Sequence, residues 1–184
     1  MIIKQHIASA TGLAKFISVC DAGLSQARVG DSVININTRD SNICFKTLKD
    51  AAYNRNIFEM FIGLEYHVSM INRHYFNADI DSVMDFQFAK YDSSSEQHYD
   101  WHCDEERWGA KSKRPRKLSI IIGLNGSETN YTGGEIQFKE NNEQHLLKSG
   151  ECLVFPSYYY HRVLPVTEGV RYSLVSWITG PQWR

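Results

Sequence analysis

The segment QHYDWHCDE, residues 97–105, contains the pattern His-x-Asp twice, beginning at His98 and at His102. Side chains alternate between the two faces of a β-strand, so a strand here would place both histidines, Asp100 and Asp104 on one face. Imidazole nitrogens and carboxylate oxygens are common ligands of iron and zinc in proteins. Either pair could therefore supply two metal ligands, and the pattern alone leaves open which pair does so.

A third ligand must come from elsewhere in the chain, and His161 is the natural candidate. It follows the apolar run CLVFP and the aromatic turn SYYY, where a jelly roll can bring a late strand beside an early one. Two histidines and one carboxylate on one face of an octahedron leave the other positions open, which suits a non-heme Fe(II) oxygenase. The same ligands also suit Zn(II), so a zinc hydrolase is an alternative. A purely structural histidine is another.

Arg171 begins the run RYSLVSWI, and Ser173 lies two residues further on, on the same face of a predicted strand. A guanidinium group binds both oxygens of a carboxylate at once, and a neighbouring hydroxyl adds a donor. An arginine that points inward from such an apolar strand needs an anionic partner. That partner is either an internal Asp or Glu or a bound dicarboxylic keto-acid, and a hydrolase would have no use for the keto-acid.

The elements that must position these residues fall into two parts. Apolar residues recur at three- and four-residue spacing in segments 12–27 and 45–76, which predicts amphipathic helices, with Gly63 dividing the second segment. From about residue 85, short alternating runs separated by Gly-, Asn-, Ser- and Pro-containing clusters predict antiparallel strands. We therefore expect one α+β, mainly β, domain over residues 1–184. A double-stranded β-helix (jelly roll) would occupy residues 85–184, and residues 1–84 would form a mainly helical supporting layer.

Composition restricts the partners. The net charge of −1 gives no global attraction to nucleic acid or to a membrane surface, and no apolar run is long enough to span a bilayer. The four cysteines show no C-x-x-C motif, which is typical of free thiols in a reducing compartment. We expect a soluble, cytoplasmic protein without membrane or nucleic-acid partners. The basic segment KSKRPRK, residues 111–117, is either a contact for an acidic substrate or a solvated loop.

Between residue 72 and the C-terminus, five segments follow one another: NRHYF, FAKYDSSSEQHYDWHCD, RKLSIIIGLN, YTGGEIQF and GECLVFPSYYYHRVLPVTEGVRYSLVSWITG. In order and spacing they resemble the 2-oxoglutarate- and Fe(II)-dependent dioxygenases of the prolyl 4-hydroxylase-like branch. The resemblance is greatest to the PKHD-type hydroxylases of bacteria and phages. It implies a motif similar to Y-x-W-H-x-D, which selects His102 and Asp104 as the metal-binding pair, with His161 as the third ligand.

The resemblance also implies roles for other residues. Arg171 would bind the distal carboxylate of 2-oxoglutarate, Tyr91 would reach toward this cofactor, and Ser173 is a candidate for a further contact. Residues 105–117 correspond to a segment that covers the substrate in members of the family. The side chains expected on the substrate side or behind the ligands are Tyr99, Trp101, Trp108 and Trp177.

The activity that the resemblance implies is hydroxylation of a substrate C–H bond, with release of succinate and CO2. The cofactors would be Fe(II), 2-oxoglutarate and O2, with ascorbate as a possible reductant. The expected substrate is a prolyl or other side chain of a protein or peptide, and a small molecule is the alternative. Demethylation of alkylated bases is disfavoured, because Trp177 occupies the position of that branch's second arginine. A different class of protein, a non-catalytic jelly-roll module that binds a metal or ligand, is also conceivable.

Overall fold

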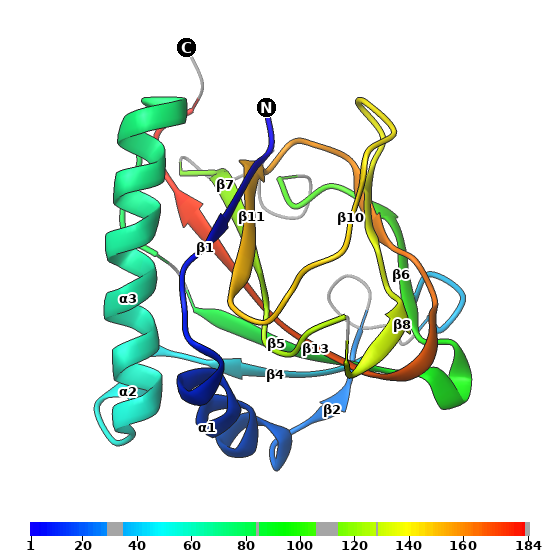
Figure 1. The fold of residues 1–184 in the computed structure, drawn as a ribbon. Coiled ribbons are helices and arrows are strands. Elements are labelled where there is room, and N and C mark those ends of the chain that lie inside the picture. The colour runs from blue at the N-terminus through cyan, green and yellow to red at the C-terminus, as the bar shows by residue number, and fades with distance from the viewer. Residues whose placement is uncertain (29–34, 84, 106–113, 128, 183–184) are drawn as a thin grey trace.

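The computed structural model describes residues 1–28, 35–83, 85–105, 114–127 and 129–182 of the chain (Figure 1). Two antiparallel β-sheets dominate it. The larger sheet has the order β1 (Ile3–His6), β11 (Glu151–Pro156), β7 (Arg116–Gly123), β13 (Val166–Thr179), β5 (Phe86–Asp92), β4 (Asn42–Lys46) and β2 (Ser25–Gln26), with β8 (Tyr131–Gly133) paired to the start of β13. The smaller sheet has the order β10 (Gln144–His145), β9 (Ile136–Phe138), β12 (His161–Val163), β6 (His98–His102) and β3 (Arg39–Asp40).

The helices lie against the outer side of the larger sheet (Figure 1). They are α1 (Ala10–Asp21), α2 (Leu48–Ala51) and α3 (Arg55–Ile71), the last continued by a π-helical turn (Asn72–Phe76), and a short 3-10 turn (Ser93–Ser95) precedes β6. The buried face of α3 carries Phe61, whose ring stacks on Phe86 of β5 with centroids 3.8 Å apart. Burying a side chain of this size contributes about 1.5–3 kcal/mol.

The strands of the larger sheet have two different faces. On β7, Leu118, Ile120 and Ile122 belong to the hydrophobic core shared with the helices, whereas Ile121 belongs to a second core on the other side of the sheet. Alternation along a strand explains this division. The inner face of the larger sheet and residues of the smaller sheet together line one cavity. The predicted α+β, mainly β, jelly-roll fold with a helical layer is thus confirmed.

The first half of the chain differs from the prediction in detail. Helix α1 ends at Asp21 instead of continuing to residue 27, because the chain then turns into β2. Segment 45–76 is interrupted at Asn54, whose side chain accepts hydrogen bonds from the N–H groups of Asn56 and Ile57 and so begins α3. The predicted division at Gly63 is wrong, since α3 runs through it. Strands β1 to β4 were also not predicted, because they are short and show no clear alternation.

Among the described residues, no helix is long and apolar enough to cross a membrane.

Candidate metal centre

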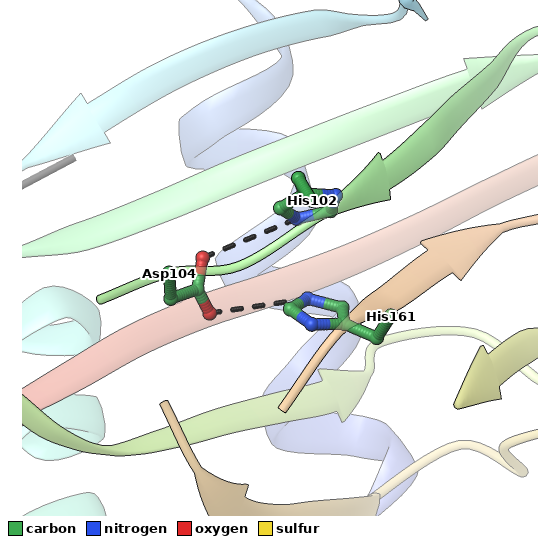
Figure 2. Close-up of side chains that lie close together, drawn as sticks. All are labelled: His102, Asp104 and His161. Carbon is green, nitrogen blue, oxygen red and sulfur yellow. Dashed lines mark ion pairs between the residues drawn. The ribbon is translucent and has the colours of Figure 1, made fainter. Parts of the chain in front are cut away.

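His102, Asp104 and His161 form a compact cluster between the two sheets. His102 ends β6 and lies directly opposite His161 of β12 in the antiparallel register. Asp104 follows two residues after the strand, and its carboxylate faces both rings (Figure 2). Its oxygens lie 4.0 Å from Nε2 of His102 and 3.9 Å from Nε2 of His161. One ligand atom from each residue lies within 4.8 Å of the others, so the three could hold one metal ion.

Hydrogen bonds orient both imidazole rings. Nδ1 of His102 lies 2.9 Å from the carbonyl oxygen of Asp100, and Nδ1 of His161 lies 3.1 Å from that of Tyr159. A carbonyl oxygen only accepts, so each Nδ1 carries the proton and each Nε2 presents its lone pair to the cluster. This is the tautomer that a metal-ligating histidine needs, fixed in the usual way by a second hydrogen bond.

The carboxylate of Asp104 is held from behind. The Ser119 hydroxyl donates to it at 2.7 Å and lies 2.9 Å from the hydroxyl of Ser157. The backbone N–H groups of Asp104 and Glu105 both donate to the Ser157 carbonyl at 3.1 Å, which fixes the turn after β6. The acid is therefore immobilised before any metal binds.

The protonation states also suit a metal. Burial, together with the nearby His161, lowers the pKa of His102 well below its usual value. Burial alone would raise the pKa of Asp104, but His161, His102, the Ser119 hydroxyl and Arg116 together hold it below its usual value. Neutral His102 and ionised Asp104 are the forms that bind a divalent cation.

Strand β6 does not alternate as expected, and the prediction that His98, Asp100, His102 and Asp104 share one face is wrong. His161 of β12 pairs with His102 of β6, and Val163 pairs with Tyr99. Between these two pairs β6 contains one residue more than β12, which is a β-bulge. The extra residue brings Tyr99 to the same side as His102, where the two rings stack with centroids 3.6 Å apart.

The bulge also separates the two His-x-Asp pairs. The two ring nitrogens of His98 lie 3.2 and 3.4 Å from the carbonyl oxygens of Glu96 and Asn37. Neither His98 nor Asp100 lines the cavity. Trp101, expected near the substrate or behind the ligands, packs against Arg162 at 4.6 Å and does not line the cavity either. Trp108 lies outside the described residues.

The other predicted side chains come from the larger sheet. Arg171, Ser173 and Trp177 lie on the inner face of β13, and Tyr91 lies opposite Arg171 on β5. Together with Tyr99, all four line the cavity that contains the three candidate ligands. The structure therefore brings together eight of the residues singled out in the sequence, leaving Trp101 apart.

Arg171 is only 2% exposed, and its Nη1 donates to the Ser173 hydroxyl at 3.0 Å. No Asp or Glu of the described residues forms an ion pair with it, so the internal partner considered from the sequence is not found there. The stem of Arg171 packs against Gly134, where a Cβ would lie 2.7 Å from Cδ of the arginine. This arginine is held in place and lines the cavity without a carboxylate partner from the described parts of the chain.

Some residues of the site escape sequence reasoning. Ser119 and Ser157 support Asp104, but Ser119 lies within the apolar strand β7 and Ser157 in the turn after β11, and neither belongs to a recognisable motif. Arg39 and Gln87 also line the cavity. Arg39 belongs to a two-residue strand, which is too short to show a periodicity.

Comparison with known proteins assigns the family. The model of the 2OG-Fe(II) oxygenase superfamily matches residues 86–179, more than half of the chain and the whole of the segment that carries the cluster. The chain belongs to this superfamily. The predicted cofactors of an Fe(II)- and 2-oxoglutarate-dependent dioxygenase, namely Fe(II), 2-oxoglutarate and O2, are confirmed at the level of the family.

Individual relatives agree with this assignment. A PKHD-type hydroxylase of Rippkaea orientalis is 33% identical over 93 residues, which are 50% of this chain and 40% of the relative. The predicted resemblance to PKHD-type hydroxylases is thereby confirmed, although this chain spans well under half the length of that relative. The fold matches a prolyl-4-hydroxylase of Pseudomonas putida with a TM-score of 0.75 at 20% identity, covering 98% of this chain and 92% of the other. A prolyl hydroxylase of Trichoplax adhaerens, solved with a hypoxia inducible factor peptide, matches with the same TM-score at 19% identity, covering 98% and 83%.

The donor set of this 2OG-Fe(II) oxygenase fits its metal. Two imidazole nitrogens and one carboxylate oxygen lie within 4.8 Å of one another, which is a donor set that suits Fe(II), and Arg171 lines the same cavity. The indole Nε1 of Trp177 is buried and has no hydrogen-bond partner among the described residues. A buried donor without an acceptor is costly, so the cavity suits an oxygen-rich ligand.

Proposed function

We propose that this 2OG-Fe(II) oxygenase hydroxylates a C–H bond of a prolyl or other side chain in a protein or peptide. The observation that carries the proposal is that the His102–Asp104–His161 cluster and the buried Arg171 line one cavity. The relatives that bear the name hydroxylase and the fold shared with prolyl hydroxylases support the choice of reaction and of substrate.

His102, Asp104 and His161 would hold Fe(II), and Arg171 would hold the distal carboxylate of 2-oxoglutarate. When bound, the two cofactors supply the oxidation, in which O2, 2-oxoglutarate and the substrate C–H group give succinate, CO2 and a hydroxyl group. Ser173 accepts a hydrogen bond from Arg171, so its own proton is available for a carboxylate oxygen beside the guanidinium. Tyr91 faces the same guanidinium, with its ring centre 5.2 Å away, and limits its movement.

The rest of the cavity would place the substrate and exclude water. Tyr99 stacks on His102 and so restrains both the ring and the nearby wall. Val163 and Val175 form apolar parts of that wall. A dry pocket with fixed polar groups orients a reacting C–H bond and limits side reactions.

The test is incubation with Fe(II), 2-oxoglutarate, ascorbate and peptides in which a proline is flanked by varied residues. We expect succinate to form in proportion to a product that has gained one oxygen atom. Hydroxylation of small molecules but of no peptide would favour the alternative substrate class. Binding of Fe(II) without any turnover of 2-oxoglutarate would favour a non-catalytic module. Ascorbate should prolong turnover without being required for its first cycle.

The four buried cysteines are free thiols, which is typical of a reducing compartment. We therefore propose that the protein acts in the cytoplasm.

A further inference from the structure

A second arginine, Arg39, lines the cavity from the opposite sheet. It lies on β3 and pairs with Tyr99 of β6, whereas Arg171 belongs to β13 of the larger sheet. The side chain of Arg39 is 1% exposed. Its Nε donates to the Ser41 hydroxyl at 3.1 Å, and its guanidinium lies 4.4 Å from the centre of the Tyr99 ring. Since Tyr99 also stacks on His102, Arg39 stands close to the candidate metal centre.

Arg39 lacks the partner that a buried cation needs. Its Nη2 is buried without a hydrogen-bond partner, and no Asp or Glu of the described residues forms an ion pair with it. Other arginines of the chain do have such partners: Arg114 binds Asp81, and Arg55 binds Glu59. A buried charge without a counter-charge is strongly unfavourable, so the position of Arg39 implies an anion that is not part of the described chain.

The positive charge of the cavity exceeds the charge that 2-oxoglutarate would neutralise. With Fe(II) bound by neutral histidines, the positive charges are those of the metal, Arg39 and Arg171, and Asp104 is the negative one. Together they leave a net charge of about +3, and the dianion of 2-oxoglutarate lowers this to about +1. One further carboxylate would neutralise the positive charge that remains. Because Arg171 would pair with 2-oxoglutarate, Arg39 is the arginine of the cavity that still lacks a counter-charge.

A basic hollow adjoins the cavity on this side. It shares Arg39 and Gln87 with the cavity and is lined further by Arg28 and Lys46, with no Asp or Glu among its described lining residues. Such a surface attracts anions and lowers the cost of bringing a carboxylate to the buried arginine.

We propose that Arg39 is a specificity-determining residue that binds a carboxylate of the substrate, so that this oxygenase acts on a C–H bond close to an acidic group. The inference rests on the proposed function for the reaction, but the carboxylate site itself can be measured separately. The carboxylate belongs either to a small organic acid or to an acidic residue beside the hydroxylated one in a peptide. The guanidinium fork fits both sources equally.

The test uses the protein with Fe(II) and saturating 2-oxoglutarate under anaerobic conditions. Benzoate and its neutral counterpart benzamide are titrated in a calorimeter into the wild type and into R39Q, R39K and R55Q. Arg39→Gln removes the guanidinium that lies over Tyr99 together with its charge, and Arg39→Lys keeps the charge. Arg55→Gln makes the same change at an exposed arginine of α3. We expect benzoate to bind at least tenfold more tightly than benzamide in the wild type and in R55Q. We expect no preference in R39Q and a reduced one in R39K.

Three outcomes would overturn the proposal. The first is equal binding of benzoate and benzamide by the wild type. The second is a benzoate preference that persists in R39Q, which would assign the anion to the metal. The third is a loss of 2-oxoglutarate affinity in R39Q as large as in R171Q, which would assign Arg39 to the cofactor. Failure of the wild type to bind 2-oxoglutarate would instead contradict the proposed function. Even in that case, a preference for benzoate that depends on Arg39 would still support the carboxylate site.

Two further pairs of probes identify the source of the carboxylate by succinate release in air. N-acetyl-L-proline with its amide represents a small acid, and acetyl-Pro-Glu-amide with acetyl-Pro-Gln-amide represents an acidic residue in a peptide. A preference for the acidic member of either pair that R39Q abolishes supports the proposal and names the source.

Discussion

His102 and His161 lie directly opposite each other across β6 and β12, with ring centres 4.2 Å apart and both Nε2 atoms directed toward Asp104. One pair of hydrogen-bonded strands therefore carries both candidate nitrogen ligands. The candidate oxygen ligand, Asp104, lies in the turn that follows β6. This arrangement depends on few residues, which makes its parts separable by mutation.

Replacing Asp104 or His161 with Ala should lower Fe(II) affinity by more than the roughly 10–100-fold typical of a supporting residue. His98→Ala is the matched control, because His98 belongs to the other His-x-Asp pair and does not line the cavity. Metal titration of the three variants, with circular dichroism to confirm folding, measures the difference. A comparable loss in H98A would contradict the choice of pair.

Ser119→Ala should weaken Fe(II) binding roughly 10–100-fold without loss of the fold, since it removes the hydrogen bond that holds Asp104. Ser176→Ala removes another buried serine, one whose hydroxyl donates to the Asp85 carbonyl. Both variants should lose about 1 kcal/mol of unfolding free energy, whereas only S119A should lose metal affinity. Equal metal affinity in the two would show that Asp104 needs no support.

Arg171→Gln should weaken 2-oxoglutarate binding by roughly 10–150-fold, the equivalent of about 1.5–3 kcal/mol for hydrogen bonds to a charged group. Fe(II) affinity should stay within about twofold of the wild type, because Arg171 is no candidate ligand. Separate titrations of metal and cofactor test this. Parallel loss of both would remove the assignment of Arg171 to the distal carboxylate.

Gly134→Ala should act on the cofactor through Arg171. The added Cβ would lie 2.7 Å from Cδ of the arginine, at a residue whose φ of +69° already disfavours a side chain. We expect weaker 2-oxoglutarate binding with unchanged Fe(II) affinity, together with some loss of stability.

Gly63→Ala is the control for this substitution, because nothing lies within 4 Å of the added atom in the middle of α3. It should raise the free energy of unfolding by about 0.5–1 kcal/mol and leave 2-oxoglutarate binding unchanged. If G63A also weakened cofactor binding, the effect of G134A could not be ascribed to contact with Arg171.

The sequence predicted the parts of the site that depend on local spacing. The inward face of β13 follows from simple alternation, which predicted that Arg171 and Ser173 share a face. Trp177 was singled out only through the family resemblance, and it lines the same cavity. Alternation failed on β6, because the bulge between Tyr99 and His102 depends on the register with β12 and leaves no mark in the sequence. The family resemblance, rather than the period of the strand, selected His102 and Asp104.

Arg39 was missed for a related reason. The strand that carries it, β3, is held by pairing with β6, which lies far away in the sequence. A strand of two residues is also too short to show an alternating pattern. The burial of its guanidinium results from the packing of the two sheets and could not be predicted from the sequence. The helix limits were predicted wrongly for a physical reason. A glycine costs only about 0.5–1 kcal/mol inside a helix, so α3 continues through Gly63, whereas the cap at Asn54 determines where that helix begins.

We propose that one cavity of this protein holds Fe(II) and 2-oxoglutarate together. The most direct measurement is an anaerobic titration of the metal-free protein with Fe(II) and then 2-oxoglutarate, followed by visible absorption. We expect a weak charge-transfer band in the wild type and none in D104A. In R171Q the band should appear only at much higher 2-oxoglutarate concentration. A folded, iron-loaded wild type that shows no such band at saturating 2-oxoglutarate would contradict it.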